Sequence, residues 1–331
     1  KREGAFEKFT KLAMHRRDES LPMASRNWTK EYKWTEKSQS QYKSLTTAYG
    51  FLIHTHNTPD VSKAIYFIDQ DSELGKPQGG NGKSLVMDSL RYYKKMSVQD
   101  GKKFRKSAEG GRFQFSDVDL DTKFVLIDDI RPEFEFDMLF SMITGDMEIE
   151  RKGKDKFVIP KDKKPKIGLT TNYVIPGTGT SYERRQHIVE FGNFWCRCND
   201  EKESPSDKKH IGKMLFGGEF TDSDWNDFFN FGFRCVQEYL TEGLVASDNS
   251  DFRMKAVKME VEGIGGDGIV TNWIHNWIRT TRLKKGLHKG NQGIAIDDFY
   301  QDFQRENLQQ TPEGGGTWDL KRFDKAIWSF V

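Results

Sequence analysis

The sequence predicts an α/β fold, and three observations support that prediction. Between residues 62 and 192, short apolar runs alternate with helical patterns, which is typical of a sheet covered by helices. A glycine-rich segment at residues 79–84 stands between one such run and a helical pattern. A later apolar run, at residues 123–128, leads into two consecutive carboxylates. A strand, a glycine loop and a helix in this order predict a site for the phosphates of a nucleotide.

Length and composition limit the classes of protein. The chain has 331 residues, 31% of them charged, and a net charge of +2, so any nucleic-acid site must be a local basic surface. Three cysteines predict no disulfide framework. No apolar run approaches the length of a transmembrane helix, so we expect no membrane partner and a cytoplasmic location. Because the chain begins at Lys1 without a methionine, we expect it to be part of a longer polypeptide.

Changes in pattern divide the chain into four expected parts. The strand candidates, at 64–69, 123–128, 166–170 and 187–191, all fall in the second part. Helical spacing of apolar residues returns at 222–240, where we expect Phe228, Phe229, Phe231 and Phe233 to pack into the core. Glycines between 263 and 268 indicate a linker, and the helices and turns beyond it suggest a winged-helix-like module. The parts are a helical N-terminal region serving as an oligomerisation collar or linker (1–60), an α/β core (61–198), a helical extension (199–262) and the C-terminal module (263–331).

The glycine-rich loop contains the residue types that hold ATP. Glycine backbones can turn their N–H groups inward around a phosphate. We expect Lys83 to reach the β- and γ-phosphates and the Ser84 hydroxyl to hold Mg²⁺. The expected nucleotide-binding residues are Gly79, Gly80, Asn81, Gly82, Lys83, Ser84 and Leu85.

The carboxylates Asp128 and Asp129 follow a buried run, as Mg²⁺-dependent hydrolysis requires. Asp128 would bind the metal's water shell, and Asp129 would orient or deprotonate the attacking water. An apolar run followed by two acids is weak evidence alone, and its position after a phosphate loop strengthens it.

Two further elements complete the expected site. The run at 166–170 leads to Asn172, which could hydrogen-bond the γ-phosphate or the attacking water. Arg184 and Arg185 precede the last run, and arginine stabilises charge on a transferred phosphoryl group, often from a neighbouring subunit. We slightly favour Arg185. An isolated asparagine usually opens a turn and an arginine usually solvates a surface, so both assignments depend on the neighbouring motifs.

A basic hairpin is predicted between the acid pair and Asn172. Residues 151–166 contain eight Lys or Arg against two Asp, and apolar alternation on both sides of residues 152–154 predicts two strands. Such a hairpin suits a DNA backbone, with Phe157 available for stacking, although a solvated lysine-rich hairpin has the same pattern. The expected DNA contacts are Arg151, Lys152, Lys154 and Lys156.

Taken together, these elements resemble the superfamily 3 helicases, especially the primase-helicases of phages, plasmids and large DNA viruses. The resemblance covers roughly residues 62–192, and all five elements agree in order and spacing. They are residues 79–84, Asp128-Asp129, residues 144–154, Thr171-Asn172 and Arg184-Arg185.

The resemblance implies an AAA+-like P-loop NTPase core that assembles into a homo-hexameric ring with ATP between subunits. Residues 144–156 would line a central channel and pull single-stranded DNA with 3′→5′ polarity. A primase or polymerase domain often precedes such a helicase. One departure is Pro77, which stands where the loop commonly has glycine and lacks an N–H donor. We expect nucleotide binding to survive and the start of the loop to differ.

The function that follows is an ATP-dependent DNA helicase motor for replication of a phage, virus or mobile element. An ATP-binding origin-recognition or scaffold protein without unwinding activity remains an alternative. A P-loop kinase is a further alternative, against which Asn172, the arginine pair and the basic hairpin argue.

Overall fold

The computed structural model describes residues 3–17, 32–58, 60–70, 79–104, 113–132, 134–175, 177, 179–195, 208–262, 300–301 and 304–305. Of the expected winged-helix-like module, only residues 300–301 and 304–305 are among the described residues. Pro77 is not among them. Within the described ranges, no helix combines the length and apolar character needed to cross a membrane.

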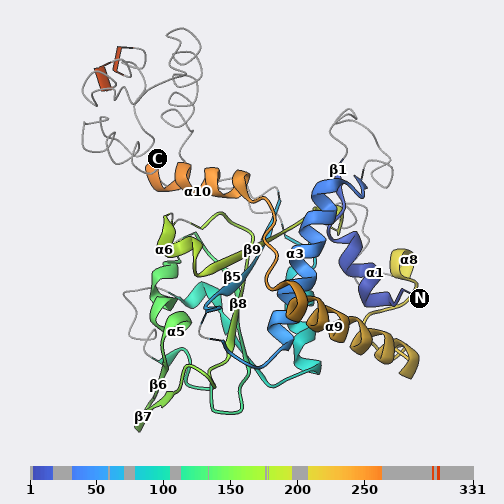
Figure 1. The fold of residues 1–331 in the computed structure, drawn as a ribbon, viewed down its shortest axis with the longest axis horizontal. Helices are drawn as coiled ribbons and strands as arrows, with labels where there is room; N and C mark the ends of the chain where they lie inside the picture. The colour runs from blue at the N-terminus through green and yellow to red at the C-terminus, as the bar shows by residue number, and fades with distance from the viewer. Residues whose placement is uncertain are drawn as a thin grey trace.

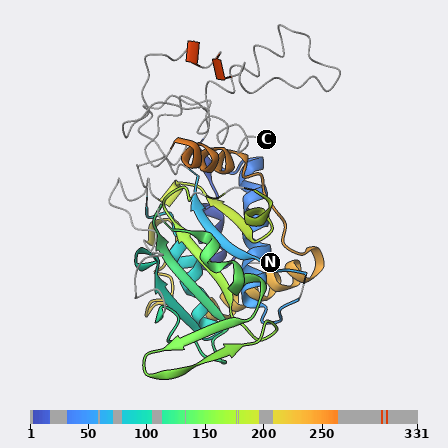
Figure 2. The same ribbon diagram turned by 90° about the vertical axis from the view of Figure 1, so that its left-hand side faces the viewer.

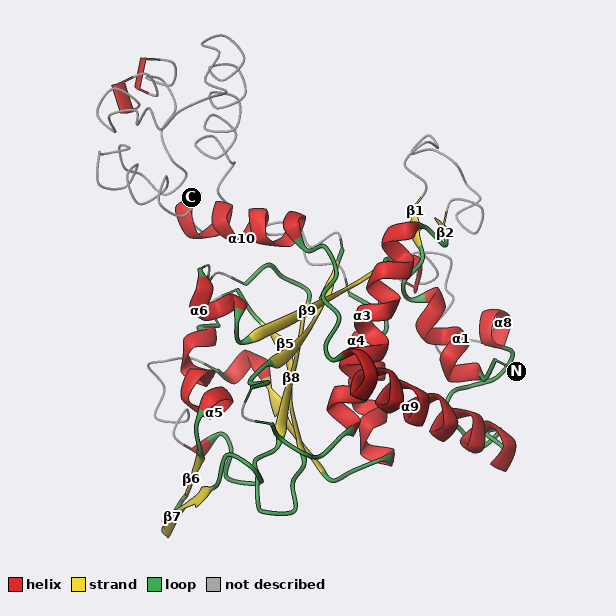
Figure 3. Cartoon of the chain, in the orientation of Figure 1, coloured by secondary structure: helices red, strands yellow, loops and turns green. Residues whose placement is uncertain are grey.

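A five-stranded parallel sheet lies at the centre of the fold (Figures 1 and 3), which confirms the α/β class. The four predicted strands are present, and the sequence missed the edge strand β4. Only one of its five residues is buried, so it carries no apolar run. The strands in chain order are β3 (Ala64–Asp69), β4 (Met96–Asp100), β5 (Phe124–Ile130), β8 (Lys166–Thr171) and β9 (Gln186–Phe191).

The spatial order of the strands is β4-β5-β8-β3-β9. It differs from the Rossmann and flavodoxin orders, because β8, the fourth strand in the chain, lies between the first and the third. The strand before the glycine loop and the strand with the acid pair are therefore not neighbours. The segment that follows β8 emerges between them, because the carboxyl ends of these parallel strands lie on the same side of the sheet.

Two cores cover the two faces of the sheet. Alternate side chains of β3 enter opposite cores: Ile65 and Phe67 lie in one, and Tyr66 and Ile68 lie in the other. β3 is a continuous apolar run because its side chains enter an apolar core on each face of the sheet. Gly168 in β8 fits this packing, because a Cβ there would lie 2.7 Å from the Phe124 ring.

Helices form the outer layers of the fold (Figure 1). The first core receives α1 (Ala5–Leu12), α3 (Glu36–Ile53), α4 (Lys83–Asp88) and α9 (Asp222–Glu242). The second receives α5 (Phe140–Thr144) and α10 (Ser250–Glu262), with α6 (Thr180–Glu183) on the same side. The smaller elements are β1 (Arg16–Arg17), β2 (Tyr32–Lys33) and α8 (Lys208–Ile211), with 3₁₀ turns at Ser89–Tyr92, Gly101–Lys103 and Phe136–Leu139.

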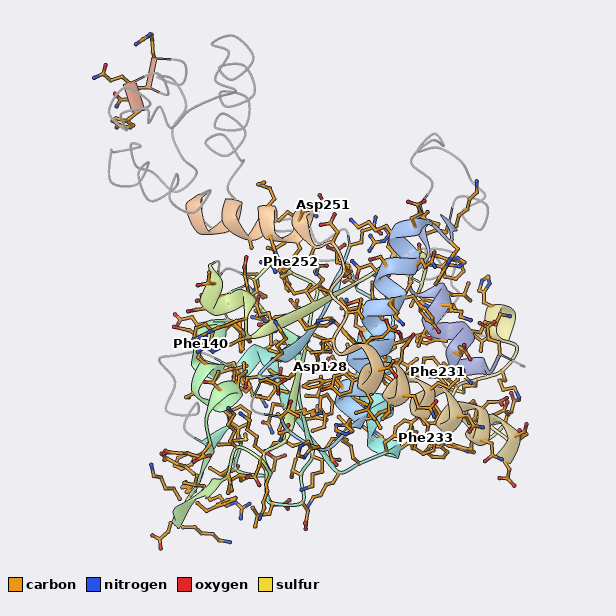
Figure 4. The ribbon with its side chains drawn as sticks, in the orientation of Figure 1. Asp128, Phe140, Phe231, Phe233, Asp251 and Phe252 are labelled. Carbon is orange, nitrogen blue, oxygen red and sulfur yellow. The ribbon has the colours of Figure 1, made fainter. Side chains whose placement is uncertain are left out.

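Helix α9 confirms the predicted helix and corrects one expectation about its phenylalanines. A capping box formed by Thr221 and Asp224 starts it. Phe228 and Phe231 are buried, but Phe233 is 56% exposed and lies on the opposite side of α9 from Phe231 (Figure 4). Residues 231 and 233 differ by about 200° around a helix, so both cannot face the same core.

Candidate nucleotide-binding site

The glycine-rich segment that leads into α4 contains two glycines in a left-handed backbone conformation. Gly80 and Gly82 have φ values of +88° and +90°, a region that other residues rarely adopt. Gly82 is also required sterically, because a Cβ there would lie 2.5 Å from Cζ of Phe9 in α1. Lys83 is the first residue of α4, and the loop's backbone therefore turns directly in front of it.

Lys83 lies in a buried network rather than in solvent. Its side chain is 5% exposed, and Nζ donates to Oδ1 of Asn172 at 2.8 Å. Nζ also forms an ion pair with Asp69, the last residue of β3. Burial lowers the pKa of Lys83, and the negative charges of Asp69, Asp129 and Asp128 oppose that shift. The ammonium group is thus placed among carboxylates at the edge of the sheet.

Asp128 receives two hydroxyl groups. Ser84 Oγ donates to Asp128 Oδ1 at 2.8 Å, and Thr170 Oγ1 donates to the same oxygen at 2.5 Å. A hydroxyl and a carboxylate oxygen at this separation are the hard donors that suit Mg²⁺, which usually takes one or two protein ligands and completes its shell with phosphates and water. Ser84 and Asp128 therefore bring together two oxygen atoms of the kind that Mg²⁺ takes as ligands.

Asp129 is oriented by its backbone and by two side chains. It has φ +58°, an uncommon value outside glycine, and its N–H donates to Thr170 Oγ1 at 2.9 Å. Its Oδ1 accepts from Asn172 Nδ2 at 3.3 Å, and its Oδ2 pairs with Lys102 Nζ at 2.5 Å. Asn172 therefore bridges Lys83 and Asp129, which is the consequence of β8 lying between β3 and β5.

These residues surround an open cavity of about 490 Å³. Every predicted nucleotide or acid residue lies on its wall except Gly79, which stands beside it: a Cβ on Gly79 would lie 3.7 Å from Asn172. The cavity is lined by Gly80, Asn81, Gly82, Lys83, Ser84, Leu85, Asp128, Asp129, Thr170 and Asn172. Asp128 lies near the centre of the fold in Figure 4.

Sequence reasoning missed three polar residues of this site. Asp69 ends an apolar run as Asp128 does, and that parallel is a usable signal. Thr170 reads as an ordinary β-branched strand residue. Lys102 belongs to a lysine pair that reads as surface.

The two predicted arginines lie in different environments. Arg185 is 8% exposed, its Nη1 donates to the Ser181 carbonyl at 2.9 Å, and its guanidinium lies 4.3 Å from the centre of the Phe140 ring. Arg184 is exposed. Arg184 is thus accessible to solvent, whereas its contacts tie Arg185 to the fold.

The predicted basic hairpin is present and projects from the body of the fold (Figures 1 and 2). Strands β6 (Met147–Arg151) and β7 (Lys154–Ile159) pair across a two-residue turn in which Gly153 has φ +69°. The lysines of the turn and of β7 are exposed, and one of them pairs with a cross-strand glutamate: Lys156 Nζ lies 2.6 Å from Glu148 Oε2.

Arg151 differs from these lysines because it is an anchor. Its Nε and Nη2 donate to the carbonyls of Ser116 and Val118 at 2.9 and 2.8 Å. Its guanidinium also lies 4.7 Å from the centre of the Phe157 ring. These contacts attach the hairpin to the segment before β5. The guanidinium of Arg151 and the ring of Phe157 pack on each other, which leaves Lys152 in the turn and Lys154 at the start of β7 as exposed cations.

Two lysines that the sequence counted with the basic run are buried. Lys164 Nζ donates to three carbonyls at the C-terminal end of α5, at 2.7–2.9 Å, and burial lowers its pKa to about 8. Lys166 Nζ donates to the carbonyl of Phe51 at the end of α3, at 2.6 Å, and burial lowers its pKa to about 6. Both satisfy helix ends, so the basic surface is smaller than the charge count indicates.

Comparisons with known proteins give limited similarity. The family of unknown function DUF5906 matches residues 75–185, which contain the loop, the acid pair, Asn172 and the arginines. No curated protein matches the chain.

Three solved structures are similar at low identity. The apo A form of the NrS-1 C-terminal region has a TM-score of 0.40 at 13% identity and covers 82% of this chain and 62% of that one. A second structure of that region scores 0.37 at 14% identity, covering 89% and 62%. A ligand-bound JCV helicase scores 0.29 at 15% identity, covering 66% and 64%. The chain therefore spans less than two thirds of each, and TM-scores this low do not establish a common fold.

Proposed function

We propose that this chain is an ATP-dependent DNA helicase motor with an AAA+-like core. One observation carries the proposal: the cavity at the edge of the sheet is lined by a glycine loop, a lysine, a serine, two carboxylates and an asparagine. These are the groups that bind a nucleoside triphosphate with Mg²⁺ and direct water at the γ-phosphate. Replication of a phage, virus or mobile element is the setting we propose from the motif resemblance.

The residues divide the work of hydrolysis among them. Lys83 would contact the β- and γ-phosphates, and Ser84 and Asp128 would hold Mg²⁺, an ion that would supply positive charge to offset the charge developing on the phosphates. Asp129, held by Lys102 and Asn172, positions the attacking water. Asn172 touches both Lys83 and Asp129, so a change at the γ-phosphate is transmitted to the water-positioning carboxylate.

Assembly and DNA contact are the further parts of the proposal. The exposed Arg184 reaches the nucleotide of a neighbouring subunit in a homo-hexameric ring. The hairpin brings Lys152 and Lys154 to single-stranded DNA, moved 3′→5′, and a primase or polymerase domain would precede this chain. The DNA contact is supported by the exposure of Lys152 and Lys154 to solvent. Arg151 meanwhile attaches the hairpin to the body of the fold.

The decisive experiment measures ATP hydrolysis with and without single-stranded DNA, followed by strand displacement. Lys83→Ala is expected to abolish DNA-stimulated hydrolysis. Lys8→Ala, which removes an exposed lysine on α1, serves as the matched control. Hydrolysis by Lys83→Ala close to that of the control would refute the proposed site. ATP binding without strand displacement would favour the scaffold alternative, and the mass in solution with nucleotide and DNA tests the ring.

A further inference from the structure

The end of β3 places a buried carboxylate against the glycine loop. Asp69 is 2% exposed. Its Oδ1 accepts from Asn81 Nδ2 at 2.8 Å, and its Oδ2 pairs with Lys83 Nζ. Asn81 is itself buried. A single carboxylate thus holds two residues of the loop, one of which is the lysine proposed to meet the phosphates.

The number of donors on Lys83 limits what it can contact at once. A lysine ammonium has three N–H donors. Asp69 and Asn172 each occupy one, so one remains for a ligand. A lysine that reaches both the β- and the γ-phosphate needs two. Full engagement of the triphosphate therefore requires Lys83 to release one of its two internal partners.

Charge decides which partner is released. Asp69 and the phosphates are both anionic and are attracted to the same ammonium, and they repel each other across a buried site. Asn172 is a neutral amide and adds no such repulsion. The contact with Asp69 is therefore the one that nucleotide weakens, while Asp69 keeps its hydrogen bond from Asn81.

We propose that Asp69 is a positioning residue that holds Asn81 and Lys83 in place before nucleotide binds and then competes with the triphosphate for Lys83. This role rests on the proposed nucleotide-binding function, and it adds a residue that influences how tightly Lys83 can bind the phosphates. It gives the phosphate loop an internal counter-charge, so that the shape of the loop does not depend on ligand.

The Asp69→Asn substitution separates the two contacts. An asparagine oxygen can still accept from Asn81, but the negative charge on Lys83 is lost. Lys83 then lacks its charged partner in a buried place, and the unliganded protein is expected to melt at a lower temperature. A non-hydrolysable ATP analogue with Mg²⁺ restores the missing charge, so the variant is expected to bind it roughly threefold or more tightly than the unaltered chain. A purely structural role for Asp69 would lower stability without tightening binding.

Two matched variants define the controls. Asn81→Ala keeps the charge of Asp69 but removes the loop contact, and it is expected to weaken binding of the analogue. Asp121→Asn removes the same charge from an exposed position shortly before the first residue of β5, at the other ends of the strands. It is expected to change neither the melting temperature nor the affinity for the analogue.

A double-substitution cycle tests the pair without nucleotide. Lys83→Met alone leaves the buried Asp69 carboxylate without its lysine counter-charge, so the Asp69→Asn/Lys83→Met protein should melt at a higher temperature than either single variant. Additive losses, or failure of the double variant to fold, would overturn the inference. Equal or weaker binding of the analogue by Asp69→Asn, when the unaltered chain binds it, would also overturn the inference and leave the proposed function standing. Absence of binding by the unaltered chain would overturn both.

Discussion

Ser84 and Asp128 come from different elements, and their side chains meet at the edge of the sheet, with Ser84 Oγ donating to Asp128 Oδ1 at 2.8 Å. Ser84 lies in the first turn of α4 and Asp128 lies near the end of β5. Thr170 from the intervening strand β8 fixes the same carboxylate oxygen at 2.5 Å. Three segments thus converge on one oxygen, and this convergence makes Mg²⁺ dependence testable residue by residue.

Ser84→Ala is expected to reduce ATP hydrolysis by about 10²-fold and to raise the Mg²⁺ concentration needed for half-maximal rate, because one oxygen ligand is lost. Hydrolysis measured across a Mg²⁺ series checks this. Ser141→Ala, at an exposed position in α5, is the control. An unchanged Mg²⁺ dependence in Ser84→Ala would show that this hydroxyl does not hold the ion.

Replacing Lys152 and Lys154 with Ala is expected to weaken binding of single-stranded DNA and to flatten its salt dependence. Each lost phosphate contact lowers the slope of log K against log salt by about 0.7 for a single strand, so two lost contacts give about 1.4. Fluorescence anisotropy at several salt concentrations measures the slope. The control removes two exposed lysines that lie outside the hairpin, Lys8 in α1 and Lys33 in β2, and an equal loss in that control would contradict a hairpin-specific contact.

The two arginines give opposite predictions. Arg184→Ala is expected to leave the melting temperature near that of the unaltered chain and to lower hydrolysis by ~10³-fold, because its exposed guanidinium is proposed to act across a subunit boundary. Arg185→Ala is expected to destabilise the fold by about 1–3 kcal/mol, because it removes the contacts to Phe140 and the Ser181 carbonyl. Melting temperature and hydrolysis measured on both proteins check the pair. A stable, inactive Arg185→Ala with an active Arg184→Ala would reverse the assignment.

The sequence predicted those features of the fold and of the site that depend on local patterns, and it did not predict those that depend on the order of the strands. The glycine loop, the acid pair and Asn172 each end or follow an apolar run, and parallel strands bring such ends together, so these residues, apart from Gly79, line one cavity. The order of the strands is not local: only the structure places β8 between β3 and β5 and thereby Asn172 between Lys83 and Asp129. Edge strand β4 has no apolar run to reveal it.

Charge patterns were the least informative, because the sequence alone does not show whether a lysine side chain is buried. Lys164 and Lys166 belong to a basic run in the sequence, yet they donate to carbonyls at the ends of α5 and α3. Arg151 likewise holds two backbone carbonyls. A helix that ends in the interior needs donors for its last carbonyls, and long cationic side chains supply them.

The burial of Lys166 predicts how stability depends on pH. Its folded-state pKa is about 6, lowered by burial and then by the nearby charge of Lys94, whereas an unfolded lysine titrates near 10.4. Between these values the unfolded chain binds more protons than the folded one. The free energy of unfolding should therefore rise with pH across this window, by up to ~1.4 kcal/mol per pH unit for this group. The penalty is fully present below pH 6 and absent above the unfolded pKa.

Lys166→Met keeps an unbranched side chain, one atom shorter, and removes the charge, so the variant is expected to be at least as stable as the unaltered chain at pH 6.5 and to lose its advantage as the pH rises. Urea unfolding at pH 6.5, 7.5 and 8.5 measures the difference. Lys103→Met removes a charge from a side chain that is 78% exposed and is expected to leave the slope unchanged. Parallel stability curves for Lys166→Met and the unaltered chain would show that Lys166 keeps its ordinary pKa in the folded protein, which would contradict its burial against the Phe51 carbonyl.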